Sequence, residues 1–303
     1  MSARSRRVAA PAADEQEGPP PPKPLVTGVA SALSPMVRRI LAPNPGVMTG
    51  PGTNTYLVGI DEVVVVDPGP DDDGHLEAIL GCGGDRIRWI VCTHTHPDHH
   101  PLTARLAAST GAEVLAYDSR DGLTVDVELR EGDLIEATEF RLRAVHTPGH
   151  ASNHLCYLVE EERLLFSGDH VMQGSTVVIA PPDGDMAAYL ASLERLRAMR
   201  PPLRAIAPGH GHLIEDPAGA LSELIAHRLD RERQVLETLD DLGGTATPAE
   251  LVARIYVDLV EELVPRARQT VHAHLRKLRD DRKVTAADPD DEGSAWVLSN
   301  NRG

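Results

Sequence analysis

Four histidines and an aspartate fall within eight consecutive residues of this chain, Thr93-His94-Thr95-His96-Pro97-Asp98-His99-His100. Neutral imidazole and carboxylate are ligands that Zn²⁺ accepts in proteins. The segment follows the apolar run Arg88-Trp89-Ile90-Val91-Cys92, which predicts a strand. Because a strand that runs into a tight loop can turn alternate side chains to one side, His94 and His96 are expected to face one ion. The spacing therefore predicts a metal site at the end of a strand.

Three further candidate ligands stand in loops that follow apolar strands. They are His150 in Thr147-Pro148-Gly149-His150, Asp169 in Ser167-Gly168-Asp169-His170, and His210 in Pro208-Gly209-His210-Gly211. The neighbouring glycines let the backbone approach closely, as a crowded metal loop requires. A single histidine beside glycine is typical of an ordinary loop, so the ordered combination carries the prediction of a metal centre.

The elements that must position these loops follow from the apolar pattern. Strands are expected at 55–58 and 63–66, joined as a hairpin, and at 88–92, 113–117, 141–146, 154–159, 163–167 and 204–207. Helices are expected at 72–80, 99–110 and 185–199. Two sets of strands, each punctuated by helices, favour two packed sheets with helices outside. The fold class expected is α/β, a four-layer αββα sandwich.

The chain changes character after His210. A long amphipathic helix is expected over 218–242, where Gly243-Gly244 ends it. Thr247-Pro248-Ala249-Glu250 has the pattern of a helix N-cap, which predicts a second helix to about Val264. A third helix over 266–282 precedes two short strands, 284–285 and 296–298, around an acidic turn. Three helices and a wing predict a small winged-helix module, packed as a lid or a dimer handle.

Composition limits the classes of function. The formal net charge of -16 disfavours nucleic acid as a general partner, because proteins that bind it usually show a basic footprint. Aromatic residues, at 3%, leave few platforms on which bases could stack. No apolar stretch approaches the roughly 20 residues of a membrane span. The three cysteines Cys82, Cys92 and Cys156 form no C-x-x-C pair, which favours a reduced, cytoplasmic setting.

The ordered ligands resemble those of the metallo-beta-lactamase superfamily, whose pattern H-x-H-x-D-H is followed by His, Asp and His in separate loops. The resemblance covers nearly all of residues 25–215 and implies two metal ions. One ion would be held by His94, His96 and His150, the other by Asp98, His99 and His210, with Asp169 as the bridge between them. Asp67 is expected to orient the histidine loop, and His154 to stand beside the ligands, without binding metal themselves.

Within the superfamily the pattern is nearest to glyoxalase II and ribonuclease Z, and nearer still to the beta-lactamase-like protein 2 group. That group shares the segment Gly52-Thr53-Asn54-Thr55-Tyr56-Leu57-Val58-Gly59, and it shares His227-Arg228 with Arg231-Glu232. The implied organisation is a disordered tail at 1–24, a hydrolase domain at 25–217 and a winged-helix-like domain at 218–303. Members that reduce oxygen at di-iron sites carry glutamate at the position of His96, so two Zn²⁺ are the expected cofactors, although iron or manganese would also accept these ligands.

The activity implied is hydrolysis by a hydroxide held between two metal ions, with Asp98 and Asp169 as the residues whose loss abolishes turnover. A small acyl thioester or ester is the preferred substrate. The preference rests on the apolar segment 174–180, which either walls the substrate pocket or forms an ordinary buried strand.

Two other functions stay open from the sequence. The first is a metal-dependent endoribonuclease on single-stranded RNA, because animal members of the group cleave such RNA. Its phosphate contacts would come from the basic run of the third C-terminal helix, Arg266, Arg268, Arg276, Lys277, Arg279, Arg282 and Lys283, which otherwise forms a solvated face paired with acidic residues. The second is a winged-helix DNA-binding regulator whose metal site only senses. A homodimer is also left open, and no membrane partner is expected.

Overall fold

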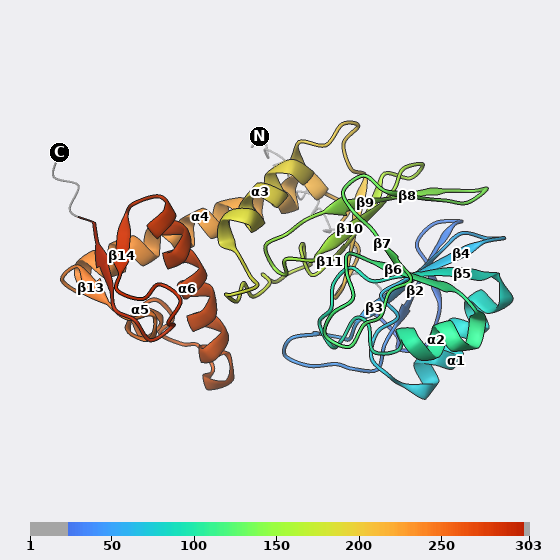
Figure 1. Cartoon of the computed structure of the whole chain (residues 1–303), viewed down its shortest axis with the longest axis horizontal. Helices are drawn as coiled ribbons and strands as arrows, with labels where there is room; N and C mark the ends of the chain where they lie inside the picture. The colour runs from blue at the N-terminus through green and yellow to red at the C-terminus, as the bar shows by residue number, and fades with distance from the viewer. Residues whose placement is uncertain (1–23, 300–303) are drawn as a thin grey trace, which may run out of the picture.

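The computed structural model describes residues 24–299, so the tail expected at 1–24 lies outside the described residues apart from Pro24. Two sheets stack face to face with helices on their outer sides, and a smaller C-terminal unit lies at one end of this sandwich (Figure 1). The expected αββα architecture with an appended winged helix is confirmed. Residues 24–299 contain no helix that is both long and apolar enough to cross a membrane.

The first sheet has seven strands in the order β1-β2-β3-β4-β5-β6-β7. Their bounds are Ser31–Ala32, Val37–Leu41, Asn54–Val58, Val63–Val66, Ile87–Val91, Glu113–Ala116 and Val127–Glu128. The expected hairpin is confirmed, because β3 and β4 pair antiparallel with Tyr56 opposite Val66. Strands β4 to β7 are parallel to one another. The sequence pattern did not predict β1, β2 or β7.

The second sheet has five strands in the order β12-β11-β10-β9-β8. The strands are β8 (Leu134–Glu136), β9 (Arg141–His146), β10 (Leu155–Val159), β11 (Leu164–Gly168) and β12 (Ala205–Pro208). Strands β8 to β11 form an antiparallel meander, whereas β11 and β12 are parallel. All but β8 match strands expected from the sequence to within one residue at each end.

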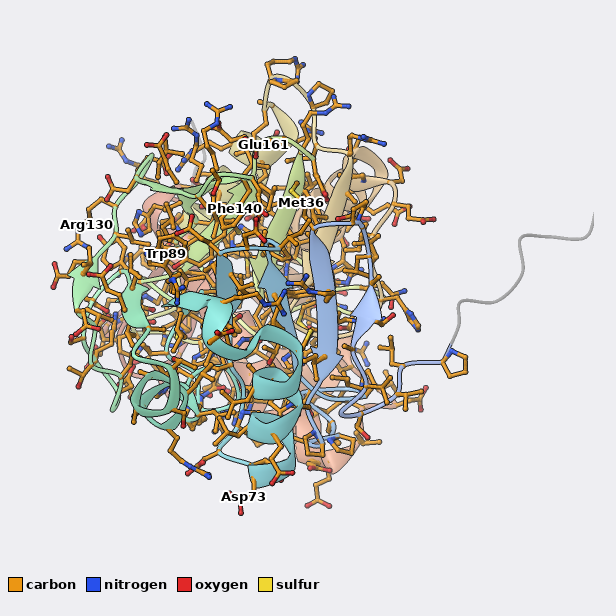
Figure 2. All side chains as sticks on the ribbon, turned by 90° about the vertical axis from the view of Figure 1, so that its right-hand side faces the viewer. Met36, Asp73, Trp89, Arg130, Phe140 and Glu161 are labelled. Carbon is orange, nitrogen blue, oxygen red and sulfur yellow. The ribbon has the colours of Figure 1, made fainter. Side chains whose placement is uncertain are left out.

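Successive side chains of a strand point to opposite faces of the sheet and so enter different layers of the core. Val64 and Val66 of β4 join the core between the two sheets, whereas Val63 and Val65 join the core beneath the outer helices. A buried valine contributes about 1.5–3 kcal/mol, so the four buried valines of β4 tie this strand firmly to both cores. Phe140 lies between the sheets, whereas Asp73 and Arg130 lie at the periphery (Figure 2).

Three helices cover the outer faces of the sandwich. Helices α1 (Asp73–Gly83) and α2 (Thr103–Thr110) pack on the first sheet, and α3 (Met186–Arg197) packs on the second. The expectation that α2 begins at His99 is wrong. The amide of Leu102 donates to the carbonyl oxygen of Gly69, outside the helix, at 3.1 Å, so residues 99–102 form turns instead of a first helical turn. The helix ends at Gly111, as expected, in the left-handed conformation with φ 71°.

The C-terminal unit is built from the long helix α4 (Pro217–Asp241), α5 (Pro248–Ile255), α6 (Val264–Asp280) and the three-stranded sheet β13-β15-β14. The strands span Thr245–Ala246 (β13), Val284–Ala286 (β14) and Trp296–Leu298 (β15), and β14 and β15 form the expected wing. Leu224 of α4 packs in the core under the second sheet, whereas Leu239 packs in the winged-helix core. Helix α4 therefore packs against both units and connects them. The domain boundary between residues 217 and 218 stays a prediction from the sequence.

Helix α5 is shorter than expected. Thr247 and Glu250 form the predicted capping box at its start. The predicted end near Val264 is wrong. The helix stops at Ile255, and Tyr256 adopts a non-helical conformation. Val257 and Val260 then face solvent, at 81% and 60% exposure, so no buried stripe continues the helix. A 3₁₀ turn over Glu261–Leu263 leads into α6.

Candidate metal centre

The seven candidate ligands come from loops at one edge of the sandwich. In the first sheet β4 and β5 are parallel, so Asp67 and the loop 93–100 leave their strands on the same side. In the second sheet the parallel strands β11 and β12 lead directly to Asp169 and His210. The amide of Leu155 donates to the carbonyl oxygen of Thr93 at 2.7 Å and joins the two edges. The topology thus brings side chains that are distant in sequence to one place.

One group of ligand atoms comprises three imidazoles and a carboxylate. His96 Nδ1 lies 3.0 Å from His94 Nε2 and 2.9 Å from His150 Nε2. Asp169 Oδ2 lies 3.8 Å from His150 Nε2. One ligand atom from each of these residues lies within 4.8 Å of the others. This is the separation expected of ligands around a single ion.

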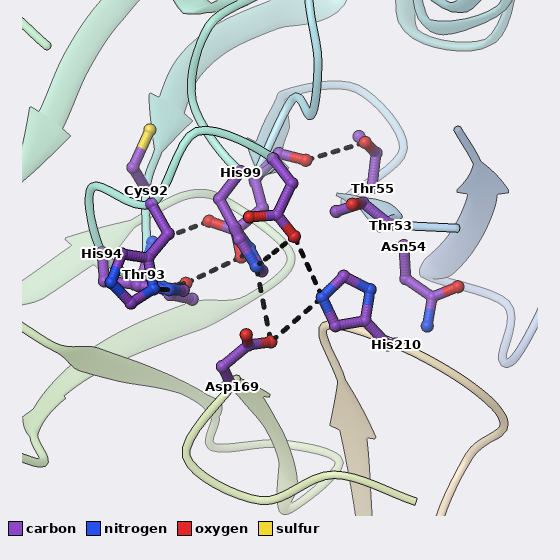
Figure 3. A network of polar contacts seen from close by, with 12 residues as sticks. Thr53, Asn54, Thr55, Cys92, Thr93, His94, His99, Asp169 and His210 are labelled. Atoms are coloured by element: carbon purple, nitrogen blue, oxygen red, sulfur yellow. Dashed lines mark hydrogen bonds and ion pairs between the residues drawn. The ribbon is translucent and has the colours of Figure 1, made fainter. Parts of the chain in front are cut away.

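A second group lies beside the first. His210 Nε2 lies 3.1 Å from Asp98 Oδ2, and His99 Nε2 lies 3.4 Å from the same oxygen. Asp169 Oδ1 lies 3.4 Å from His99 Nε2 and 3.3 Å from His210 Nε2 (Figure 3). The two oxygens of Asp169 therefore face the two groups, the position that a bridging ligand would occupy.

The other ring nitrogen of four of these histidines has a partner that fixes the direction of the ring. Nδ1 of His150 lies 2.8 Å from the carbonyl oxygen of Val178, and Nδ1 of His210 lies 3.1 Å from that of Gly52. Nδ1 of His94 lies 3.0 Å from Thr93 Oγ1, and Nδ1 of His99 lies 2.9 Å from Asp67 Oδ2. Such partners hold Nε2 toward the centre and select the tautomer whose Nε2 can bind a cation.

Asp67 organises the histidine loop. Its Oδ1 accepts a hydrogen bond from the amide of Thr93 at 2.7 Å, and its Oδ2 accepts from the Thr93 hydroxyl at 2.7 Å and faces His99 Nδ1. The residue has φ 49°, a left-handed conformation that aspartate tolerates better than most residues. The strained backbone turns the carboxylate toward the loop, and strain of this kind clusters at functional sites.

Gly209 lets the two sheets approach closely at the site. A Cβ atom at this position would lie 2.7 Å from Asp169 Oδ1 and 2.8 Å from His99 Cε1. Both distances are shorter than real contacts, so any side chain here would displace atoms of the centre. The glycine that the sequence places before His210 is therefore required by close packing at this position.

Burial and charge set the protonation of the centre. Burial lowers the pKa of His94, and it lowers the pKa of His150 to about 4. Burial would raise the pKa of Asp98, but the neighbouring charges of His99 and His210 outweigh it and lower this pKa to about 2. The pKa of Asp169 is likewise held well below its usual range, because attraction to His99 outweighs burial. Ionised carboxylates beside neutral imidazoles are the forms that bind a cation.

His99 and His210 differ from the other imidazoles of the centre. Burial would lower the pKa of each, but the carboxylates of Asp98, Asp169 and Asp67 raise the pKa of His99 well above the ordinary value, and those of Asp98 and Asp169 raise the pKa of His210. The Nε2 atom of His99 is buried and has no hydrogen-bond partner within residues 24–299, and the same holds for His210 Nε2 and Asp169 Oδ1. Buried polar atoms without partners are costly. Their convergence fits a cation that the three atoms would share.

Two further buried histidines stand behind the ligands. The ring of His154 lies 5.0 Å from that of His94, and its Nδ1 lies 2.9 Å from Thr147 Oγ1. The ring of His154 thus lies against that of a candidate ligand, and its role beside the metal stays a prediction. His170 follows Asp169, and its ring lies 4.8 Å from that of Tyr189 on α3.

The centre opens into a cavity of about 600 Å³. His96, Asp98, His150 and Asp169 form its polar floor. Its walls comprise Val47, Met48, Thr49, Pro97, Met172, Ser175, Thr176, Val177, Val178, Ala180, Asp183, Leu263 and Arg266. Segment 174–180 contains no strand, so the buried-strand alternative is wrong. Five of its residues, Ser175 to Val178 and Ala180, line this cavity, and its role as a substrate pocket stays a prediction.

Several residues around the cavity were not predicted from the sequence. The loop between β2 and β3, which carries Val47 and Met48, extends toward the start of α6 (Figure 1). Leu263, just before α6, and Arg266 in its first turn line the same cavity. No local sequence signal marks these residues, because their role arises from contact between distant segments. The C-terminal unit thereby forms part of the cavity wall through Leu263 and Arg266.

Comparison with known proteins defines the class. The model of the metallo-beta-lactamase superfamily matches residues 48–212, more than half of the chain, and the model of the beta-lactamase associated winged helix domain matches residues 247–296. The chain therefore belongs to the metallo-beta-lactamase superfamily, and it is a metal-dependent hydrolase of that fold with a C-terminal winged helix.

Individual relatives extend over both units. The chain is 32% identical to a Beta-lactamase-like protein 2 homolog from Drosophila melanogaster, over 89% of this chain and 95% of the relative. It is 29% identical to the Atrochrysone carboxyl ACP thioesterase dmxR1 of a Cryptosporiopsis species, over 83% and 82% of the two chains. A beta-lactamase domain protein from Burkholderia ambifaria has the same fold, with a TM-score of 0.77, 22% identity, and coverage of 91% of this chain and 95% of that one.

Proposed function

We propose that the chain is a dinuclear zinc hydrolase of small acyl thioesters or esters. One ion would be held by Nε2 of His94, Nδ1 of His96 and Nε2 of His150. The second would be held by Asp98 and by Nε2 of His99 and His210, and Asp169 would bridge the two. The observation that carries this proposal is the convergence of buried, unpartnered atoms, His99 Nε2, His210 Nε2 and Asp169 Oδ1, beside a second group of imidazoles.

The donor set fits zinc, which binds imidazole nitrogen and carboxylate oxygen. When bound, two such ions would polarise the acyl oxygen of the substrate and lower the pKa of a water molecule toward about 7. The chain's own residues would hold this centre in place. Asp67 and the carbonyl groups of Gly52 and Val178 orient imidazole rings, and Gly209 leaves room for Asp169 beside His99.

The cavity supports an acyl substrate. Aliphatic and thioether side chains from Val47, Met48 and Met172 line it together with segment 175–180, and such walls suit an acyl chain. A relative that covers most of this chain is named as a thioesterase of an acyl carrier protein substrate, which supports thioester cleavage here. We also propose that the enzyme acts in the cytoplasm, and the support for this is the cysteine content of the chain.

The surface of α6 supports a small substrate over RNA. Its basic side chains are largely engaged by carboxylates of the protein itself. Arg276 Nη1 lies 2.6 Å from Asp290 Oδ1, and Lys277 Nζ lies 2.8 Å from both Glu232 Oε2 and Asp281 Oδ2. Neutralised in this way, the helix offers little free charge to a phosphate backbone, whether of RNA or of DNA.

The test is a panel assay with zinc-loaded protein on acyl thioesters, lactones and a single-stranded RNA oligomer. We expect thioesters to be turned over fastest, and we expect Asp98→Ala and Asp169→Ala to abolish turnover while circular dichroism shows a folded protein. Faster cleavage of the RNA oligomer than of any thioester would overturn the substrate choice. Undiminished activity in either variant would overturn the site.

A further inference from the structure

Arg266 is the one cationic side chain among the residues that line the metal cavity within the described part of the chain. It comes from the winged-helix unit, two residues after the start of α6 at Val264. Apolar residues of the same wall include Leu263 in the 3₁₀ turn before α6 and Val47 and Met48 on the loop between β2 and β3. A single cation in such a wall gives the cavity a defined polar contact beyond the metal ligands.

Arg266 differs from the other basic residues of α6 in its partner. Arg268 pairs with Glu292, Arg276 with Asp290, and Arg279 with Asp280. By contrast, the contact of Arg266 is with a neutral group, Gln269 Oε1, at 3.2 Å from Nη1. Its positive charge is therefore not neutralised by a carboxylate of the described chain.

Acidic residues that precede Arg266 in the sequence or line the same cavity form no ion pair with it within the described residues. Glu261 and Glu262 precede it in the 3₁₀ turn without forming an ion pair with it. Asp183 also lines the cavity, but its Oδ1 lies 3.0 Å from Arg120 Nη2 and its Oδ2 accepts a hydrogen bond from the amide of Ser152 at 3.0 Å. The guanidinium of Arg266 is thus free to bind an external anion.

A positive charge at residue 266 is also unfavourable for the stability of helix α6. The first turn of a helix carries the positive end of the helix dipole, where a cation is destabilising and an anion is stabilising. A cation placed there does not serve the stability of α6. An anion bound at Arg266 would be stabilised by both the guanidinium charge and the helix dipole.

We propose that Arg266 is a specificity-determining residue that binds an anionic group of the acyl substrate, a phosphate or a carboxylate, while the scissile bond lies at the metal ligands. The inference rests on the proposed acyl hydrolase function and adds the class of substrate. A guanidinium binds either anion through paired N–H donors. Because the chain carries a net charge of -16, a local cation also offsets the general repulsion of an anionic substrate.

The experiment compares thioesters that share one acyl chain but differ in charge. The first carries the chain on coenzyme A, whose phosphates supply the anion, and the second carries it on neutral N-acetylcysteamine. A third pairs N-acetylcysteamine with an acyl chain that ends in a carboxylate. The two anionic arms distinguish a phosphate on the thiol side from a carboxylate on the acyl side.

In Arg266→Gln we expect kcat/KM for at least one anionic thioester to fall about 10-fold or more, chiefly through KM, with the neutral thioester unchanged. Arg266→Lys should retain part of the preference, and high salt should raise KM for the anionic substrate in the wild type but not in Arg266→Gln. The melting temperature should stay equal or rise. Arg254→Gln makes the same charge change at an exposed site on α5 and should alter nothing.

An unchanged ratio of anionic to neutral turnover in Arg266→Gln, or an equal loss in Arg254→Gln, would overturn the role of Arg266 and leave the acyl hydrolase proposal intact. An equal loss for all three thioesters would also overturn it, because it would indicate a general defect. If the wild type hydrolyses none of the three thioesters, the role of Arg266 fails together with the thioester part of the proposed function, and the lactones of the panel assay test the ester part separately.

Discussion

The guanidinium of Arg228 on helix α4 donates a hydrogen bond to the backbone carbonyl of Val177 in the cavity wall. The next carbonyl, that of Val178, lies 2.8 Å from Nδ1 of His150. Arg228 also lies over the ring of Tyr189, at 5.3 Å, and the Tyr189 hydroxyl donates to the carbonyl of His170 beside Asp169. A buried arginine of the linking helix thus supports two loops of the metal centre.

Replacing Arg228 by methionine should weaken both the fold and the site. The change removes the donor and leaves the Val177 carbonyl unpaired, which should lower the free energy of unfolding by about 1–3 kcal/mol. Turnover per folded molecule should also fall, and Arg228→Lys should be milder. Denaturant unfolding and kcat/KM measure this, with exposed Arg233→Met on the same helix as the control, where a change within about 1 kcal/mol is expected. Equal stability and activity of the two methionine variants would contradict the role of Arg228.

Asp67→Asn should weaken metal binding without unfolding the chain. The amide keeps one oxygen for the Thr93 amide but cannot serve both the Thr93 hydroxyl and His99 Nδ1 as the carboxylate does. Loss of such a partner typically lowers metal affinity about 10–100-fold. Competition with a chelator of known affinity measures the change. Asp241→Asn, at the exposed end of α4, should bind metal as the wild type does, and an equal affinity for Asp67→Asn would refute the role given to Asp67.

Gly209→Ala should disturb the centre while the sandwich remains folded. The added methyl group would meet Asp169 Oδ1 and His99 Cε1 at distances that force one of them to move. We expect weaker metal binding and a large loss of turnover, since small displacements of catalytic groups are costly. Gly81→Ala on α1, where a Cβ meets nothing within 4 Å, should keep full activity. Normal metal content and turnover in Gly209→Ala would show that the site tolerates the displacement.

The effect of zinc on stability should grow with pH. In the metal-free protein the carboxylates raise the pKa of His99, so its protonated form contributes stability fully below about pH 6.5 and loses it as pH rises through the raised pKa. A metal ion must displace that proton, so its apparent affinity rises over the same interval. Melting temperatures with zinc and with a chelator, from about pH 6 to about pH 9, should therefore diverge. A constant difference would contradict this reading of His99.

Much of the fold and the candidate site could be predicted from the sequence because their signals are local. The apolar run Val63–Val66 predicts a strand buried on both faces, and the 93–100 segment carries most of its ligands within one loop. By contrast, β2 was missed because Arg38 and Arg39 interrupt its apolar pattern, although Arg39 is buried at 9% exposure. The start of α2 was misplaced because a contact with Gly69, distant in sequence, decides it.

The parts that the sequence could not supply depend on contacts between distant segments. The carbonyl groups of Gly52 and Val178 orient two imidazoles through backbone atoms, which leave no trace in residue type. Arg266 could be recognised as part of a basic run, but its separation from the paired arginines follows only from the positions of the acidic residues of the wing. Its place on the cavity wall follows from the way α4 ties the winged helix to the sandwich.

Zinc titration of the metal-stripped protein, with thioester hydrolysis recorded at each addition, shows whether the chain works through a pair of metal ions. We expect two ions to bind per chain and activity to follow their occupancy. We expect Asp169→Ala, which lacks the residue facing both groups, neither to bind the pair nor to turn over substrate. Full activity in protein without bound metal, or an Asp169→Ala variant that binds both ions and hydrolyses thioesters as the wild type does, would contradict this expectation.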